Sequence, residues 1–567
     1  MPDIKNSLKE NFSIYLAISL FSLIPVFQLI FIENYNQFLI YDNLSFESVY
    51  FYLSKSYSLI NKFTLFYADF QKEQIILTHD FVPNIIVAFF LIVFEKHALL
   101  VLSTLLLFFT TYFFTIFFHK LLLIRKSESL IIALVILNFM GVGPDSVKTI
   151  LNYFTFNDFR NSLFLRIYYP MISSILLVFY LFFLNKFYKK KKIFVIITFS
   201  LLNFFTYFYS ALIVIMCNFF YSTSFIKTKA KFFSINLLSI VVLLFYYSLS
   251  IYHSNTTSIS SLSANYVLDI PNFDFLLNNF RNNFISICLI LLLIFFYKKN
   301  KHVICKLFFF HAILQLITLP EIFFHEMQVS MHIGMYFFRA LNFITLFYLI
   351  FKTLDSFYLT KFYNFMAIFL AGFFLIVHIT YYKKINLIEN KNIVSQNLIL
   401  KDLKKIKEII FTIEHIEKSI YIDSPYANAV FHSSNENKKK LIHNNFYINN
   451  AIIFRSSKIT QRESVNNFIF TCKIFEIKVD DCYKDFIFNY SNTFFNKSFS
   501  YTGDRNFDFN KFELYYADNN DIGSNYFKNF YYIISQNDLN YNKKIKYFQD
   551  SGAVIKKLSI LDLAYYN

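Results

Sequence analysis

The chain has 567 residues, of which 56% are hydrophobic and only 16% are charged, and its mean hydropathy is +0.43. This composition excludes an ordinary soluble enzyme of that size and is typical of a polytopic membrane protein. The net charge of +17 would suggest a nucleic-acid partner in a soluble protein. Here the lysines gather in short loops between apolar segments, where they set membrane orientation, so we expect no nucleic-acid partner.

Apolar segments recur along the first two thirds of the chain, and about 20 apolar residues suffice for one helical crossing. The stretch 83–94 is too short to cross and is predicted to be a helix lying in the membrane interface. As one helix, the run 193–225 would be about 50 Å long, so we expect it to form two crossings. The predicted crossings, about eleven in number, cover residues 14–32, 98–118, 129–143, 168–185, 193–208, 209–225, 233–252, 283–297, 303–319, 334–351 and 364–382.

The distribution of lysines predicts the orientation of these crossings. With the N-terminus in the cytoplasm, the lysine-rich segments around Lys5, Lys120 and Lys189 all fall on the cytoplasmic side, as the positive-inside rule requires. An odd number of crossings then places residues 386–567 outside. We therefore predict a polytopic α-helical transmembrane domain over 1–385 and a soluble extracytoplasmic domain over 386–567, in a bacterial inner (plasma) membrane.

The C-terminal part is polar, and strand-like runs such as SIYIDS and NFYYIIS alternate with helix-like stretches. This interleaving predicts a small α/β domain. Cys472 and Cys482 both fall in it, and a disulfide between them is compatible with export but is not decided by the sequence.

The first outer loop carries acids immediately after the first crossing. Glu33 and Asp42 lie there, and a carboxylate at the membrane surface can act as a general base or hold a divalent cation such as Mg²⁺ or Mn²⁺ against a diphosphate. No set of metal ligands with a recognisable spacing accompanies them. We name Asp42 and Glu33 as candidate catalytic residues.

The second outer loop carries Asp158, Arg160 and Arg166 shortly before Pro170. The planar fork of an arginine can bind a phosphate through two hydrogen bonds. Arginines at this depth can equally anchor a helix to lipid headgroups. The sequence leaves both interpretations open.

The densest polar cluster follows the ninth predicted crossing. If residues 321–332 are helical, Glu321, His325, Gln328 and His332 share one helix face. The sequence HEMQV has valine where a zinc protease needs its second histidine, so we expect no zinc site. Arg339 falls inside the next crossing, where a cation requires a partner.

Two features together resemble known families. The segment FRNSLFLRIYYPMISSILLVFYLFF, a lysine-rich turn and LLNFFTYFYSALIVI resemble a group of uncharacterised bacterial polytopic membrane proteins that have an R-x-x-x-P helix start and an aromatic hairpin. The whole layout resembles the membrane-embedded glycosyltransferases of the C type. The first loop lacks the D-x-D or D-E pair of better-known members, so the assignment of Asp42 or Glu33 depends on position alone.

The resemblance implies transfer of a sugar from a polyprenyl-phosphate donor to a glycan acceptor on the outer face of the membrane. Asp42 or Glu33 would be the base, the arginines would bind the lipid phosphate, and the histidine cluster would line the acceptor side. The implied partners are membrane lipid, the lipid-linked sugar and the glycan. A polysaccharide polymerase or ligase, a flippase or transporter, and an envelope assembly protein remain alternatives. The sugar, the acceptor and the oligomeric state stay open.

Overall fold

The structure is a computed structural model. It describes residues 2–31, 56, 59–60, 66–68, 75–77, 81–139, 171–187, 193–224, 241, 288–289, 291–292, 294–295, 301–318, 337–354, 360–412, 419–422, 446–448, 469, 472, 477–484, 509–518, 530–536 and 541–566. The chain divides into two compact units. Unit 1 comprises Met1–Val49, His79–Tyr247 and Leu268–Asn390, and unit 2 comprises Tyr50–Thr78, Ser248–Val267 and Lys391–Asn567.

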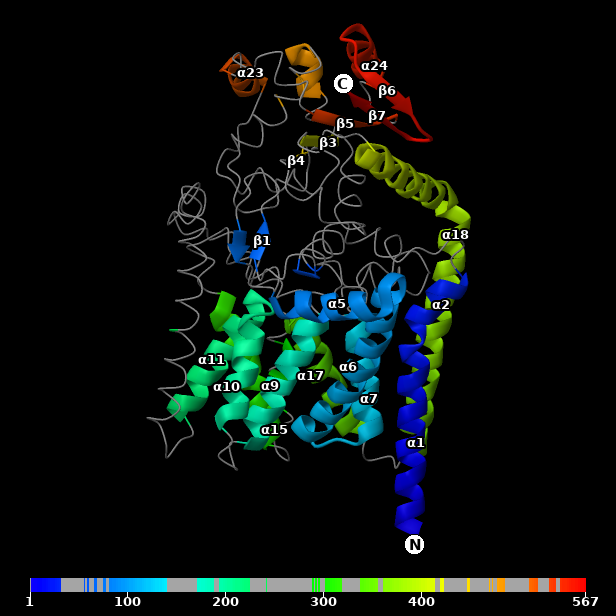
Figure 1. Cartoon of the computed structure of the whole chain (residues 1–567). Coiled ribbons are helices and arrows are strands. Elements are labelled where there is room, and N and C mark those ends of the chain that lie inside the picture. Colours follow the sequence, from blue (N-terminus) through cyan, green and yellow to red (C-terminus); the bar gives the residue numbers. More distant parts are fainter. Residues whose placement is uncertain are drawn as a thin grey trace. The chain divides into compact units, whose positions relative to one another are not determined.

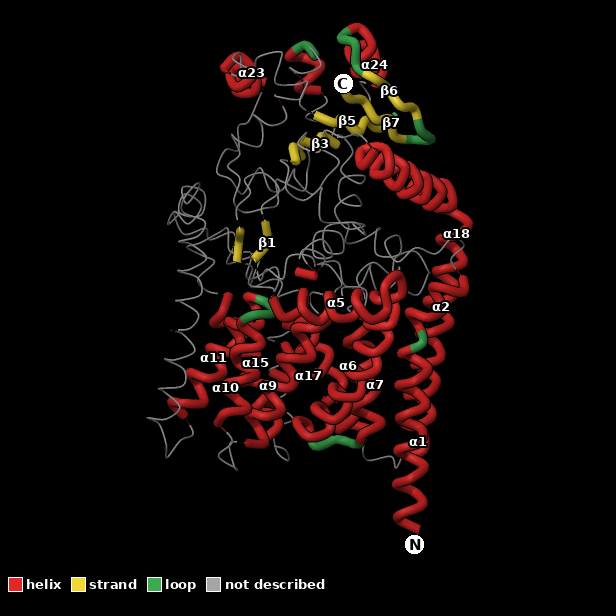
Figure 2. Tube along the Cα trace, viewed as in Figure 1, coloured by secondary structure: helices red, strands yellow, loops and turns green. Residues whose placement is uncertain are grey.

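Unit 1 is a bundle of helices (Figures 1 and 2). Its described elements are α1 (Pro2–Ser22), α2 (Ile24–Phe31), α5 (Phe81–Phe94), the short 3-10 helix η2 (Glu95–His97), α6 (Ala98–Leu122), α7 (Lys126–Phe139), α9 (Ser173–Phe187), α10 (Ile193–Phe204), α11 (Phe208–Ser224), α15 (Lys301–Thr318), α17 (Arg339–Leu354) and the first part of α18 (Thr360–Thr412).

A tight turn joins α6 to α7. Helix α6 ends at Leu123, which adopts the left-handed conformation with φ of 54° that commonly ends helices. The backbone N–H of Arg125 donates to Glu128 Oε2 at 2.9 Å, which is half of a capping box at the start of α7. The two helices therefore pack antiparallel.

Helices α9, α10 and α11 form a second antiparallel group. Aromatic rings pack between them and α6, with centroids 4.4 Å apart for Phe113–Phe179 and 5.0 Å apart for Phe183–Phe199. Helices α10 and α11 are separated by a turn at 205–207. The run 193–225 forms two helices, and the prediction that each crosses the membrane stays a prediction.

Helix α5 lies across one end of this bundle (Figure 1). Near its start, the Val82 N–H donates to Phe205 O at 2.9 Å in the α10–α11 turn, and its end leads through η2 into α6. The predicted short helix at 83–94 is therefore present. Its position at a membrane interface stays a prediction.

Helices occupy every predicted crossing that falls within the described residues, but most are short. Among the described residues, two helices are long and apolar enough to cross a membrane, Ala98–Leu122 and Phe362–Lys383. Helix α10, with 12 residues, is shorter than the roughly 20 residues of a full crossing. The predicted segments 233–252 and 283–297 lie almost wholly outside the described residues. The described part of the chain is therefore mostly helical, with a small sheet near the C-terminus.

Unit 2 contains that sheet. Strand β5 pairs in parallel with β3 and antiparallel with β7, which gives the order β4-β3-β5-β7-β6. Its described elements are β3 (Ser419–Ile422), β4 (Phe446–Ile448), α23 (Phe509–Asp518), β5 (Phe530–Ser535), α24 (Tyr541–Asp550), β6 (Val554–Lys557) and β7 (Leu561–Tyr565), together with the separate pair β1 (Phe66–Ala68) and β2 (Ile75–Leu77).

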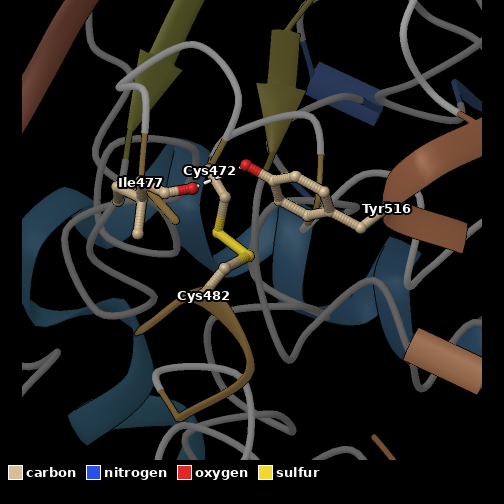
Figure 3. The surroundings of a disulfide bond; sticks show 4 residues. All are labelled: Cys472, Ile477, Cys482 and Tyr516. Carbon is tan, nitrogen blue, oxygen red and sulfur yellow. Dashed lines mark hydrogen bonds between the residues drawn. A yellow bond between two sulfur atoms is a disulfide. The ribbon is translucent and has the colours of Figure 1, made fainter. Parts of the chain in front are cut away.

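A disulfide joins Cys472 to Cys482 in the hydrophobic core of unit 2 (Figure 3). Beside it, the Tyr516 hydroxyl of α23 donates to Ile477 O at 2.6 Å (Figure 3). The sequence left this disulfide open, and the structure contains it. Helix α18 is continuous for 53 residues and passes through the predicted domain boundary at 385/386.

Candidate functional site

Arg339 is the candidate site residue that falls within the described part of the chain. The other candidates, namely Glu33, Asp42, Asp158, Arg160, Arg166, Glu321, His325, Gln328 and His332, lie outside the described residues. Their convergence on one site stays a prediction.

Arg339 is the first residue of α17 and is half-buried, with its Nη1 atom shielded from solvent. The positive end of a helix dipole lies at its N-terminus, where it favours anions and disfavours cations. A guanidinium at this point therefore adds to an existing positive potential instead of neutralising it. Such an arrangement suits an anionic group, phosphate included.

The described lysines near the α6–α7 turn mark one end of the bundle, which we call the lysine end. Lys126 Nζ at the start of α7 donates to Asn11 Oδ1 of α1 at 2.9 Å. Lys120 Nζ near the end of α6 lies 5.0 Å from the ring centroid of Phe182, near the end of α9. The N-terminal half of α1, the α6–α7 turn and the end of α9 therefore lie together.

The opposite end of the bundle is called the α5 end. It contains the start of α9, the α10–α11 turn, the end of α7 and the start of α17. Asn203 Nδ2 near the end of α10 donates to Leu176 O at 3.1 Å, which places the start of α9 beside the α10–α11 turn. The rings of Phe139 and Phe343 lie 6.2 Å apart, which places the end of α7 beside the start of α17. Helix α17 therefore begins, with Arg339, at the α5 end.

A buried polar network connects α9, α10 and α11, and sequence reasoning missed it. The Tyr180 hydroxyl donates to Asn218 Oδ1 at 2.7 Å, and Asn218 Nδ2 donates to Ser200 Oγ at 3.4 Å. All three side chains are buried. Asparagines inside otherwise apolar runs were the available signal, because a buried amide needs partners.

Two buried oxygens near the α5 end have unused hydrogen-bonding capacity. Asn203 Oδ1 and Ser174 Oγ are shielded from solvent and find no partner among the described residues. Asn203 is otherwise held through its Nδ2, which donates to Leu176 O and Phe199 O. Each of these oxygens could accept a hydrogen bond from a water or a hydroxyl group.

Two buried histidines also link helices. His378 Nε2 of α18 lies 3.3 Å from Asn138 Oδ1 of α7, and His311 Nε2 of α15 lies 3.2 Å from Thr345 Oγ1 of α17. Neither was singled out from the sequence, because a lone histidine in an apolar run carries no spacing signal. These contacts link α18 to α7 and α15 to α17.

Asp562 is one of two buried carboxylates that lie near the β6–β7 hairpin of unit 2. Asp562 accepts hydrogen bonds from Gln536 Nε2 at 2.9 Å, from the Tyr541 hydroxyl at 2.5 Å and from the Leu558 N–H at 3.2 Å. Burial, followed by the hydrogen bond to Asp562 and its negative charge, raises the pKa of Tyr541 to about 12. These contacts are structural in character, since Asp562 is fully buried.

Within the described residues, no group of three or more histidine, cysteine, aspartate or glutamate side chains is arranged to hold a metal ion. The predicted divalent cation would bind at Glu33 or Asp42, and it stays a prediction. No protein-family model matches the chain, and no curated protein shows significant similarity to it.

Proposed function

We propose that the protein is a multi-pass membrane glycosyltransferase of the C type, which transfers a sugar from a polyprenyl-phosphate donor to a glycan on the outer face. The observation that carries the proposal is the two-ended arrangement of unit 1. The described helix ends that lead toward Glu33 and Arg166 belong to α2 and α9 and lie away from the lysine end. On this proposal, the candidate catalytic and phosphate-binding segments adjoin the α5 end, where Arg339 lies.

Exposed apolar surface supports membrane insertion. On α18, Phe365, Phe369 and Ile376 expose more than half of their surface, while Ala371 and Val377 on the other face are fully buried. A contiguous exposed apolar stripe of this kind is costly in water and marks a membrane or protein contact. Together with the apolar length of Phe362–Lys383, it favours lipid as the solvent for this helix.

The disulfide supports export of unit 2. Structural disulfides persist outside the cytoplasm, where thiols are not kept reduced. Cys472 and Cys482 are both buried in the core, so the bond belongs to the folded state. Independently of unit 2, the positive-inside rule favours an orientation in which the lysine end of unit 1 faces the cytoplasm.

The proposed chemistry assigns one role to each group. Asp42 or Glu33 removes the proton from the acceptor hydroxyl, and this oxygen attacks the anomeric carbon as the bond to the lipid phosphate breaks. Arg160, Arg166 or Arg339 stabilises the negative charge on the departing phosphate. Direct displacement inverts the anomeric configuration. The cluster from Glu321 to His332 lines the acceptor side.

The test compares surface glycan in cells that carry Asp42→Asn, Glu33→Gln or, as a matched control, Glu47→Gln. We expect at least one of the first two to lose the glycan at unchanged protein level, and the control to retain it. Normal glycan in both candidate variants would overturn the assignment of the base. Accumulation of lipid-linked intermediates on the cytoplasmic side would instead favour a flippase.

A further inference from the structure

A row of lysines lies on the solvent face of α18 within unit 2. Lys401, Lys404 and Lys405 are exposed, whereas the neighbouring Leu403 and Ile406 are buried. Helical spacing explains this division, because residues three and four apart share a face. Glu408 is the acid that α18 adds to the same exposed face, one turn after Lys404.

Asp402 attaches this part of α18 to the β6–β7 hairpin. Its Oδ2 accepts hydrogen bonds from the backbone N–H groups of Ile560, at 2.6 Å, and Leu561, at 3.1 Å. The carboxylate is fully buried, and two backbone donors hold it in a fixed position. These bonds hold the helix segment that carries the three lysines against residues 560–561, which follow β6 and begin β7.

Strand β6 carries two more cations, whose side chains leave opposite faces of the strand because successive strand residues alternate. Lys556 and Lys557 are exposed at the end of β6, which is the edge strand of the sheet. We call the five residues Lys401, Lys404, Lys405, Lys556 and Lys557 the basic surface. None of them forms an ion pair with any residue that the structure describes. Edge lysines discourage strand pairing, but that role does not require an adjacent lysine row on a helix.

We propose that the basic surface binds an acidic polysaccharide. Five ammonium groups without described acidic partners, fixed on one helix and one strand, match a chain that carries a carboxylate or phosphate on successive residues. The disulfide argues for an exported unit 2, where anionic glycans are encountered and nucleic acids are not. The inference rests on the proposed function, since it identifies the acceptor glycan as acidic and unit 2 as the part that holds it.

The test measures binding of fluorescent polygalacturonate to the purified full chain in detergent, with neutral dextran of similar length as the comparison ligand. We expect saturable binding of polygalacturonate that weakens as salt increases, because salt screens exposed charges. The variant Lys401→Glu/Lys404→Glu/Lys405→Glu should weaken binding by about tenfold or more. Lys556→Glu/Lys557→Glu should weaken it in the same direction. The control Lys478→Glu/Lys484→Glu changes exposed lysines of unit 2 outside the basic surface and should leave binding unchanged.

Circular dichroism and retention of the Cys472–Cys482 disulfide verify that each variant is folded. Equal binding of polygalacturonate by wild type and by the lysine variants, equal binding of dextran, or no binding at all would overturn the proposal. Binding to phosphatidylglycerol vesicles but not to polygalacturonate would overturn it in favour of a lipid surface. Because this assay needs no sugar transfer, its failure leaves the transferase proposal standing, and the glycan result with Asp42→Asn does not affect it.

Discussion

Single residues in unit 2 show how a buried acid is stabilised. Asp562 is satisfied by donors from β5 through Gln536, from α24 through Tyr541 and from the hairpin through Leu558. A buried carboxylate without such donors would be strongly destabilising. The hairpin that carries β6 and β7 therefore depends on the side chains around this one group.

In Tyr541→Phe, the stability of unit 2 should fall less steeply as the pH rises into the alkaline range. The pKa of Tyr541 is raised to about 12, above the value of about 10 in an unfolded chain. Its stabilising contribution is therefore complete below pH of about 10 and is lost as pH rises toward about 12. Hydrogen exchange of β5 and β7 amides in the full chain, between neutral pH and pH of about 11, measures this.

At neutral pH the same substitution should destabilise unit 2 by about 1–2 kcal/mol, because Asp562 loses one donor. Tyr547→Phe on the same helix is a suitable control, since its ring packs against Phe548 and its hydroxyl makes no bond to Asp562. If the stability of unit 2 falls equally steeply at alkaline pH in wild type and Tyr541→Phe, Tyr541 is not the source of this pH dependence.

The Tyr180–Asn218 bond should contribute modestly to unit 1. Hydrogen bonds between membrane helices have coupling energies that average about 0.6 kcal/mol and reach about 1.7. A double-mutant cycle with Tyr180→Phe and Asn218→Leu, measured by unfolding in detergent, should give a value in that range. Pairing Tyr180→Phe with Asn138→Leu, whose partner is His378, should give no coupling.

Whether the sequence can single out a residue depends on whether the importance of its side chain is independent of the neighbours that folding supplies. Arg339 could be singled out because a cation in an apolar run is costly wherever it falls. Asn203 and Ser174 could not, because small polar residues are tolerated in apolar helices and their importance depends on neighbours that folding brings together. Asp402 was missed for the same reason, since its donors, Ile560 and Leu561, are far away in the sequence.

At the scale of elements, the lengths of the apolar segments predicted which runs form helices better than they predicted where elements begin and end. The break in 193–225 followed from bilayer thickness alone, and the structure places it at 205–207. The run from 386 to 412 was expected to begin a new domain, because it is polar, but it contains no glycine or proline and α18 continues through it. The run KKLSILDLAYY is shared by β6 and β7, with residues 558–560 between them.

Helix α5 offers a direct test of membrane contact because the chain contains no tryptophan. Phe89 is 59% exposed on α5, and Phe89→Trp should give blue-shifted emission that brominated lipids quench in proteoliposomes. Leu514→Trp, at a position 63% exposed on α23 of unit 2, is the control and should respond to a water-soluble quencher only. Red-shifted emission from Phe89→Trp that brominated lipid leaves unquenched would rule out an interfacial α5.

For the molecule as a whole, the decisive quantity is the sidedness of the two ends of unit 1. In a background with Cys217, Cys288 and Cys305 replaced by serine, Glu95→Cys at the α5 end should react with an impermeant maleimide in intact cells. Lys120→Cys at the lysine end should react only after permeabilisation. Glu95 and Lys120 are both exposed in the structure. Labelling of both from one side would contradict the proposed orientation.

The disulfide stabilises unit 2, and the proposed export would allow it to persist. The two cysteines are separated by 10 residues, and closing a loop of this size stabilises a fold by about 2–3 kcal/mol. Cys472→Ser/Cys482→Ser should therefore increase hydrogen exchange throughout β5 and α23. Cys288→Ser, which removes a free thiol, should not. Unchanged exchange in the double variant would show that core packing alone holds unit 2 together.

The order of strands in unit 2 has a consequence for biosynthesis. The strand nearest the C-terminus, β7, lies inside the sheet between β5 and β6, and all five of its residues are buried. Until the ribosome has delivered residues 561–565, one edge of β5 has no neighbour, and an open edge can pair with other chains. A nascent unit 2 must therefore be shielded until β7 is in place, and a variant that lacks residues 561–565 should expose this edge and become prone to aggregation.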